Sequence, residues 1–181
     1  DYRIIGNSTP RFKYGITLDA AWKGFDFSIF MQGIGKRDLW LDGCYFWGAN
    51  GQGNEWQSTG FAEHWDFFRP EGDPLGANLN SYYPRVNFSG DRNTKVQTRY
   101  LQNGAYLRLK NVQLGYTLPR VWTEKAGISS VRVYVSGDNL ATITSLSKIF
   151  DPEATGSLAG TGSGKLYPLQ RVISVGVNVN F

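Results

Sequence analysis

The sequence has very little cysteine and histidine. Cys44 is the single cysteine and His64 the single histidine among 181 residues. One cysteine cannot form an internal disulfide, and one histidine leaves little for a histidine-based metal centre or a serine–histidine–aspartate triad. We therefore expect no catalytic residue, no metal site and no cofactor, and an enzyme is the last class to consider.

Long apolar runs and charge runs are also missing. No stretch approaches the roughly 18 consecutive apolar residues of a transmembrane helix. The formal charge is +4, but the lysines and arginines are scattered and form no basic stripe. A nucleic-acid partner is therefore not expected, and a membrane protein would have to cross the bilayer with strands.

Alternating strand patterns are the main feature that is present. From Ile173 to Phe181, apolar residues alternate with polar residues or glycine. Successive side chains of a strand point to opposite faces, so this segment predicts one apolar and one polar face. The same alternation runs through residues 12–20, 25–33, 112–118 and 131–136. The prediction is an all-β chain.

One of these segments changes its parity. Leu107 and Leu109 are out of phase with Val112 and Leu114, with the change just upstream of Asn111. A single extra residue in one strand has this effect on the alternation. The change predicts a β-bulge at this point, or a strand that leaves the bilayer there.

The connections between the segments alternate in length. Lys23–Gly24 is a tight turn and residues 119–129 are a short connection, in which residues 120–126 predict one helical turn between Pro119 and Gly127. Residues 35–104 and 144–169 form long connections. Outer-membrane barrels have short periplasmic turns and long extracellular loops. The pattern favours an antiparallel transmembrane β-barrel segment with long extracellular loops.

An aromatic girdle supports that orientation. If the chain ends on the periplasmic side, aromatic residues from separate segments fall at one rim, as a membrane interface requires. These are Trp22, Phe25, Tyr116, Trp122 and Phe181. A soluble β-sandwich or jelly roll alternates equally well and stays open as an alternative fold.

Four stretches resemble the SusC/RagA type of TonB-dependent outer-membrane transporter. They are YLRLKNVQLGYTLP at 106–119, VYVSGDNL at 133–140, FDPE at 150–153, and YPLQR at 167–171 leading to Phe181. Their order and spacing resemble the end of that family's barrel. The resemblance implies that residues 1–181 are about the last five strands of a 22-stranded barrel, without its plug domain and N-terminal strands.

The resemblance also implies a function, a location and partners. The family imports nutrients, usually glycans and sometimes peptides, across the Gram-negative outer membrane. Its partners are a SusD-like surface lipoprotein and, through an N-terminal part absent from this sequence, the TonB complex. The lipid bilayer and the barrel-assembly machinery are further expected partners, the latter through a C-terminal signal at Val175, Val177, Val179 and Phe181. A passive porin or adhesin barrel and a soluble carbohydrate-binding β-sandwich are the alternatives.

Tryptophans gather in the first long connection. Their rings could stack on sugars or peptide side chains, which makes Trp40, Trp47, Trp56 and Trp65 candidate substrate-binding residues. The alternative is that so long a connection needs an aromatic core of its own.

The remaining charged residues receive simpler interpretations. Lys13, Arg108, Lys110 and Arg132 could line the lumen and favour anionic or polar solutes, or could be ordinary rim charges. Asp138, Asp151 and Glu153 are expected to order the loop after the fourth strand, with Asp151 forming a turn before Pro152. Residues 63–66, with sequence EHWD, are interpreted as loop polarity.

Overall fold

The computed structural model describes residues 2–51, 60–155 and 165–181. The chain forms two compact units, each treated by itself. The strand unit comprises Pro10–Arg37, Gly104–Ser145 and Leu169–Phe181. The loop unit comprises Asp1–Thr9, Asp38–Asn103 and Leu146–Pro168.

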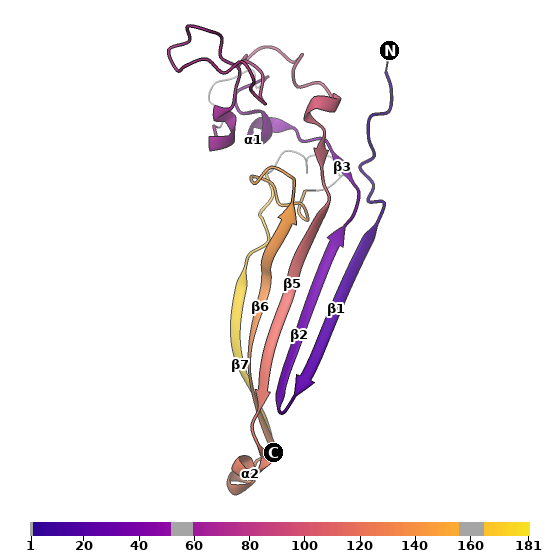
Figure 1. The fold of residues 1–181 in the computed structure, drawn as a ribbon, viewed down its shortest axis with the longest axis vertical. Coiled ribbons are helices and arrows are strands. Elements are labelled where there is room, and N and C mark those ends of the chain that lie inside the picture. The colour runs from indigo at the N-terminus through magenta and orange to yellow at the C-terminus, as the bar shows by residue number, and fades with distance from the viewer. Residues whose placement is uncertain (1, 52–59, 156–164) are drawn as a thin grey trace. The chain divides into compact units, whose positions relative to one another are not determined.

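The strand unit is a five-stranded antiparallel sheet in the order β1-β2-β5-β6-β7 (Figure 1). Its strands are β1 (Lys13–Trp22), β2 (Phe25–Ile34), β5 (Tyr106–Thr117), β6 (Ser130–Thr144) and β7 (Val172–Asn180). Each strand pairs with the next of these along the chain, and the sheet is open at β1 and β7. The all-β prediction is confirmed, although β5 and β6 run well past the predicted ranges 112–118 and 131–136.

Helices contribute little to the described structure. In residues 2–51, 60–155 and 165–181, no helix combines the length and the apolar character needed to cross a membrane.

The strand register sorts the side chains into an apolar face and a polar face. Paired residues on antiparallel strands share a face, so one residue of each strand fixes a whole row. One apolar row is Ala20, Phe27, Leu114, Val135 and Val175; the next is Trp22, Phe25, Tyr116, Val133 and Val177. Between them, on the other face, lies a row that includes Asp26, Gly115, Tyr134 and Gly176. The apolar face is open to the surroundings, with the Val175 residue 76% exposed.

The predicted bulge is confirmed, and its effect on the strand is clear. Phe30 pairs with Asn111 and Met31 pairs with Leu109, which makes Lys110 the extra residue of β5. The extra residue returns Leu107 and Leu109 to the face that carries Val112 and Leu114. The neighbouring strand β6 is irregular at the same level, where Asn139 adopts a φ of 52°.

The short connections are as predicted. Lys23 and Gly24, with φ values of 47° and 88°, form the two-residue turn between β1 and β2. Positive φ at both central residues is what a type I′ hairpin turn requires. The connection after Pro119 forms the short helix α2 (Arg120–Thr123) and the 3₁₀ helix η4 (Glu124–Ala126), and Gly127 ends it with a φ of 70°.

The predicted girdle residues lie at one end of the strand unit. Trp22 pairs with Phe25, which pairs with Tyr116, and the Phe25 and Tyr116 ring centroids are 4.5 Å apart. Trp122 lies in α2 directly after β5, and Phe181 follows the last residue of β7. The register thus places Trp22, Phe25 and Tyr116 at one level, whereas Trp122 and Phe181 lie beyond the ends of the strands. Contact of these residues with a membrane interface stays a prediction.

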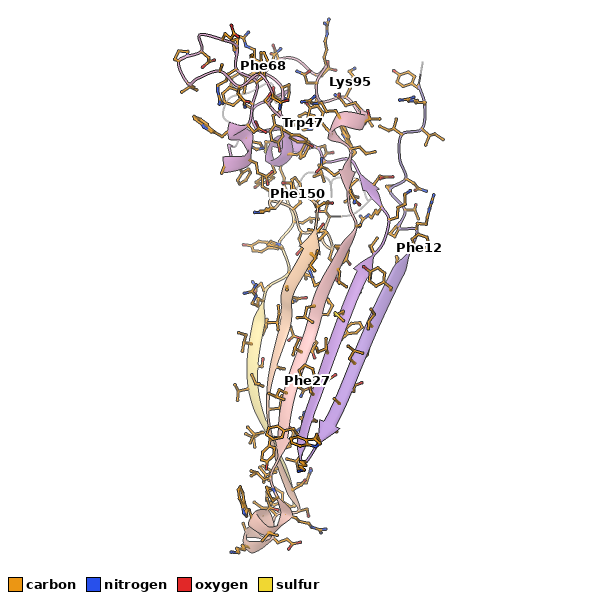
Figure 2. The ribbon with its side chains drawn as sticks, in the orientation of Figure 1. Phe12, Phe27, Trp47, Phe68, Lys95 and Phe150 are labelled. Carbon is orange, nitrogen blue, oxygen red and sulfur yellow. The ribbon has the colours of Figure 1, made fainter. Side chains whose placement is uncertain are left out.

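The loop unit has its own hydrophobic core. It contains β3 (Asp38–Leu39), which pairs with β4 (Gln102–Asn103), the helix α1 (Gly43–Trp47), and the 3₁₀ helices η2 (Ala62–Trp65) and η3 (Thr98–Tyr100). The core residues come from separate segments: Leu39, Leu41, Phe46, Trp47, Tyr83, Tyr100, Leu146 and Phe150. Figure 2 shows Trp47 and Phe150 among these side chains.

Deletion of Lys110 should be tolerated in the longer barrel that the sequence predicts. Asn111 would then follow Leu109 directly, so Leu107 and Leu109 would stay on the apolar face and Arg108 on the polar face without a bulge. Deletion of Gln113 is the control, because it removes a regularly paired residue and turns Val112 to the polar face and Asn111 to the apolar face. Heat-modifiable migration of the outer-membrane fraction should show a folded barrel for the Lys110 deletion and less folded barrel for the Gln113 deletion. Equal folding of both variants would contradict this role of the bulge.

Candidate functional site

An ion pair crosses the polar face between strands that are not neighbours. Arg132 on β6 donates from Nε to Asp26 Oδ1 on β2 at 2.9 Å, and from Nη2 to Asp26 Oδ2. The pair passes over Gly115 of the intervening strand β5, where a Cβ atom would come within 2.6 Å of the Asp26 carboxylate. Only glycine leaves room for it. Because Arg132 is paired, it is not an uncompensated lumenal charge.

Aromatic rings cover glycines on the same face. The guanidinium of Arg132 lies 5.0 Å from the ring centroid of Tyr134. Tyr134 in turn covers Gly176, where a Cβ atom would come within 2.5 Å of the tyrosine hydroxyl. Such rings shield the exposed backbone of a glycine in a strand. The polar face is therefore a surface of charges and aromatic rings rather than a simple hydrophilic wall.

The other predicted lumenal cations differ in their surroundings. Arg108 is 3% exposed and donates from Nε to Thr142 Oγ1 at 2.9 Å. Lys110 occupies the bulge. Lys13 is exposed at the start of β1, in the row of Ile34 and on the polar face.

The four predicted substrate-contacting tryptophans are not equivalent. Trp47 is 2% exposed in the core of the loop unit, and Trp40 packs against that core with its ring 5.9 Å from Trp47. Trp65 is 62% exposed, and the Arg69 guanidinium lies 5.7 Å from its ring. Trp56 lies outside the described residues. The structure brings Trp40 and Trp47 together as core residues, and substrate contact by the tryptophans stays a prediction.

The residues interpreted as loop polarity have specific structural roles. His64 Nδ1 accepts a hydrogen bond from the Phe61 backbone N–H at 3.0 Å, and its Nε2 lies 3.0 Å from the Phe46 carbonyl. Glu63 accepts hydrogen bonds from Ser147 Oγ at 2.8 Å and the Lys148 backbone N–H at 3.2 Å. The Glu63 contacts join the two long connections, whereas both His64 contacts lie within the first. Sequence reasoning missed the Glu63 contacts because the partners lie 84 and 85 positions along the chain.

Asp151 orders the backbone of the second long connection. Its Oδ1 accepts from the Glu153 backbone N–H at 2.8 Å, which confirms Asp151 as a turn former. Asp138 differs from the expected loop role, because it lies within β6, where its Oδ1 accepts from Asn111 Nδ2 at 2.7 Å beside the bulge. Across the part of the chain that is described, no group of three or more His, Cys, Asp or Glu residues could hold a metal ion.

Burial shifts the pKa of ionisable groups outside the strands, among them Tyr83 and Arg37. Desolvation raises the pKa of Tyr83 well above its ordinary value, and the nearby Glu63 carboxylate raises it further. Desolvation lowers the pKa of Arg37, and the interaction with Tyr106 partly opposes this shift. The Tyr83 phenol stays neutral at physiological pH, as a core position requires.

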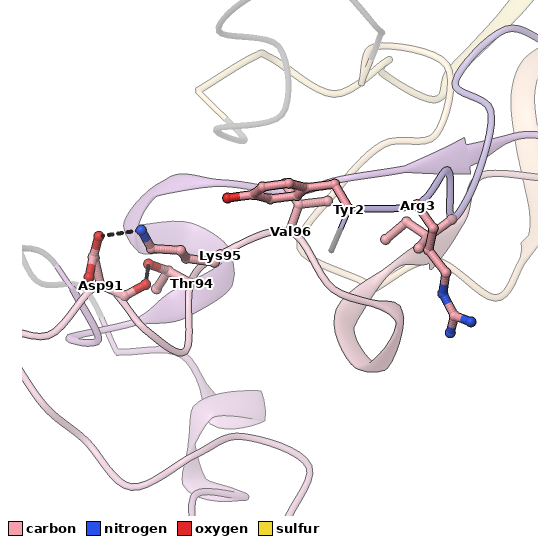
Figure 3. Close-up of a pocket in the computed structure, with 7 residues that line it drawn as sticks. Tyr2, Arg3, Asp91, Thr94, Lys95 and Val96 are labelled. Carbon is pink, nitrogen blue, oxygen red and sulfur yellow. Dashed lines mark hydrogen bonds and ion pairs between the residues drawn. The ribbon is translucent and has the colours of Figure 1, made fainter.

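A pocket of about 600 Å³ lies in the loop unit (Figure 3). Tyr2, Val96 and the Asp91–Lys95 ion pair, with an N–O distance of 3.2 Å, line it. Arg3 also lines the pocket and extends away from this pair. Asp91 and Lys95 neutralise each other and are largely exposed, so their ion pair stabilises the pocket little.

Gly115→Val should uncouple Asp26 from Arg132. The added side chain must displace the ion pair, so Arg132→Gln should lower the melting temperature less in the Gly115→Val background than in the native protein. The four proteins of this double-mutant cycle separate the pairwise effect from the single changes. Gln113→Val, on the same face two residues away, is the control. Additive effects of Gly115→Val and Arg132→Gln would contradict the proposed contact.

Trp47→Ala and Trp65→Ala should differ in their effect on the loop unit. Loss of a buried tryptophan costs about 3–5 kcal/mol, whereas the exposed Trp65 contributes about 1 kcal/mol through its cation–π contact. Hydrogen exchange of the loop unit, measured in the full parent protein, should reveal local opening only in Trp47→Ala. Equal protection in both variants would show that Trp47 is not a core residue.

Comparisons with known proteins agree with this architecture. No protein-family model matches the chain. The whole chain aligns with TonB-dependent receptor P3 of Formosa agariphila at 32% identity over 191 positions, and with TonB-dependent receptor P26 of the same organism at 28% over 191 positions. It covers 17% and 18% of these two receptors. The chain therefore spans less than a fifth of the length of the curated relatives it matches.

Solved structures give the same result. The RagAB peptide transporter matches 99% of the chain at 27% identity with a TM-score of 0.75, and the chain covers 18% of the matched protein. The RagAB peptide importer in its open-open state matches the same share of both chains at 27% identity with a TM-score of 0.73. Whole-chain similarity in both sequence and structure, together with the open antiparallel sheet, shows that this chain is a β-barrel segment of the SusC/RagA type of TonB-dependent receptor, a family of outer-membrane proteins.

Proposed function

We propose that the chain forms part of the pore wall of an outer-membrane importer that is energised through TonB. The observation that carries the proposal is the register, which places most apolar residues of all five strands on one face and the charged residues on the other. A sheet with one face in lipid and one in water is the wall of a transmembrane barrel. The names of the relatives support the TonB dependence.

The remainder of the barrel comes from other parts of the parent protein. The edges at β1 and β7 leave backbone groups unpaired, and unpaired groups in lipid cost several kcal/mol each. The chain also covers only 17% of its P3 relative, which leaves ample sequence for the missing strands and a plug domain. In this proposal residues 1–181 are the C-terminal part of the barrel, and the strands cross the membrane several times.

Transport is proposed to need two partners and no covalent chemistry. The matched structures are of RagAB, a peptide importer with two named components. A SusD-like lipoprotein in the place of the second component would deliver glycans or peptides to the pore. Trp65 is the tryptophan whose exposed ring could contact such a solute. Val175, Val177, Val179 and Phe181 would serve the barrel-assembly machinery.

Uptake should depend on both the receptor and TonB. Cells are supplied with a mixture of oligosaccharides and oligopeptides, and depletion of each solute from the medium is measured in the native strain, a receptor deletion and a TonB-depleted strain. At least one solute should remain unused in both altered strains. Uptake that requires the receptor but not TonB would indicate a passive porin. Expression of the receptor as a monodisperse soluble protein without detergent would indicate a β-sandwich instead.

A further inference from the structure

Unbalanced positive charge lies at one end of the polar face. This is the end at which β2 runs into the long connection, and it carries Arg11, Lys13 and Lys36 as exposed residues. The Arg11 backbone N–H donates to the Lys36 carbonyl at 2.9 Å, and the Gly35 N–H donates to the Phe12 carbonyl at 2.9 Å. These bonds continue the β1–β2 register in which Lys13 faces Ile34. Alternation from Lys13 and Ile34 places all three cations on the polar face.

No acidic residue balances these cations on the polar face. Asp138 is the nearest acid in the polar rows, and it already accepts a hydrogen bond from Asn111. From that level to the end of the sheet, the described polar-face positions hold no aspartate or glutamate. They form three successive rows: Gly15, Gln32, Arg108 and Thr142; Lys13, Ile34, Tyr106 and Thr144; and Arg11 and Lys36. The charged residues in these rows are therefore all cations.

The arrangement of Arg11 and Lys36 is unfavourable without an anion. Like charges directly opposite each other on paired strands repel and destabilise the pairing. Neither side chain forms a hydrogen bond or ion pair with another described residue. If these cations were only ordinary charges at the rim of a barrel, in bulk water, there would be no reason for one to lie opposite another on the same face. An anion between the two side chains would convert repulsion into two favourable contacts.

A pocket of about 460 Å³ adjoins these cations. Lys13, Gly15, Phe30, Gln32, Ile34 and Tyr106 all line it. The ring of Phe30 covers Gly15, with a ring carbon 3.3 Å from where a Cβ atom would stand. A pocket with an aromatic ring, an amide and a cation can hold the neutral part of a solute while its charged group lies on the cations.

We infer that this end of the polar face is an anion-binding site for solutes that enter the pore. Arg11, Lys13 and Lys36 take a sulfate, carboxylate or phosphate group, and the pocket beside Phe30 takes the ring or side chain that carries it. The inference rests on the proposed function, because the polar face is a lumen only in a closed barrel. Lipid headgroups are a poor match, since Phe12 and Tyr14, the two neighbours of Lys13, occupy positions of the apolar face, opposite to the cations.

Fluorescent dextran sulfate and uncharged dextran serve as the probes. The full parent receptor is purified in detergent, and anisotropy is measured for the native protein and for the triple variant Arg11→Gln, Lys13→Gln, Lys36→Gln. The variant should bind dextran sulfate at least about tenfold more weakly, because each lost charge-assisted contact is worth about that factor. The affinities of the two proteins for uncharged dextran should differ by less than about twofold.

The control variant removes the same number of charges at the other end of the sheet. This second triple variant, which carries Lys23→Gln, Arg120→Gln and Lys125→Gln, should bind dextran sulfate like the native receptor. Equal loss in both triple variants, or no dextran sulfate binding by the native receptor, would overturn the inference. A third result would also overturn it: the first triple variant binds dextran sulfate normally but no longer co-purifies with lipopolysaccharide. The cations would then face the outer leaflet rather than the lumen.

Failure of this inference can be told apart from failure of the proposed function. Heat-modifiable migration and TonB-dependent uptake are measured on the same variants. A folded receptor with TonB-dependent uptake and no preference for dextran sulfate overturns only the anion site. Strong dextran sulfate binding that depends on the three cations, in a receptor whose uptake does not require TonB, overturns only the proposed energy coupling.

Discussion

Strand register is the constraint on which the whole strand unit depends. Side chains alternate with a period of two, so a slip of one residue in any pairing would move that strand's apolar residues to the polar face. Five strands keep one apolar face only because each pairing is in phase with the next. The bulge at Lys110 and the irregularity of β6 near Asn139 are part of this phasing, since β5 and β6 carry extra residues at the same level. The polar rows, with Asp26, Arg132 and the cations near Lys13, follow from the same register.

The strands and turns could be predicted because their causes are local. Alternation between neighbours gave the five segments, and the parity change near Asn111 located the bulge to within a residue. Positive φ at Lys23 and Gly24 follows from the short connection between two alternating runs. The upper part of β6 was missed because Asn139 and Leu140 interrupt the alternation that an unbroken strand would show. The Asp26–Arg132 pair could not be predicted, since its partners are 106 positions apart and meet only through two strand pairings.

The loop unit shows why residue type alone is a weak guide to function. Tryptophans suggested a solute-binding surface, yet Trp47 is buried and Trp65 is exposed, and nothing in their local sequence distinguishes them. Polar residues near His64 suggested a solvated loop, yet His64 binds the Phe46 carbonyl within the first long connection and Glu63 joins that connection to the second. Burial in an irregular unit is decided by contacts between distant segments rather than by a repeating pattern. The candidate site on the strands was therefore partly visible from the sequence, and the interior of the loop unit was not.

The alternating lengths of the connections also set an order of assembly. The β1–β2 pairing closes a two-residue turn, whereas β2 ends at Ile34 and must find β5, which begins at Tyr106. Loop-closure entropy grows with the length of the closed segment, and contacts distant in sequence form late. The two hairpins β1–β2 and β5–β6 are thus expected to form before they pair with each other, because that pairing must close the intervening residues around Phe46 and Trp47. On this expectation, folding of the loop unit sets how fast the two hairpins meet.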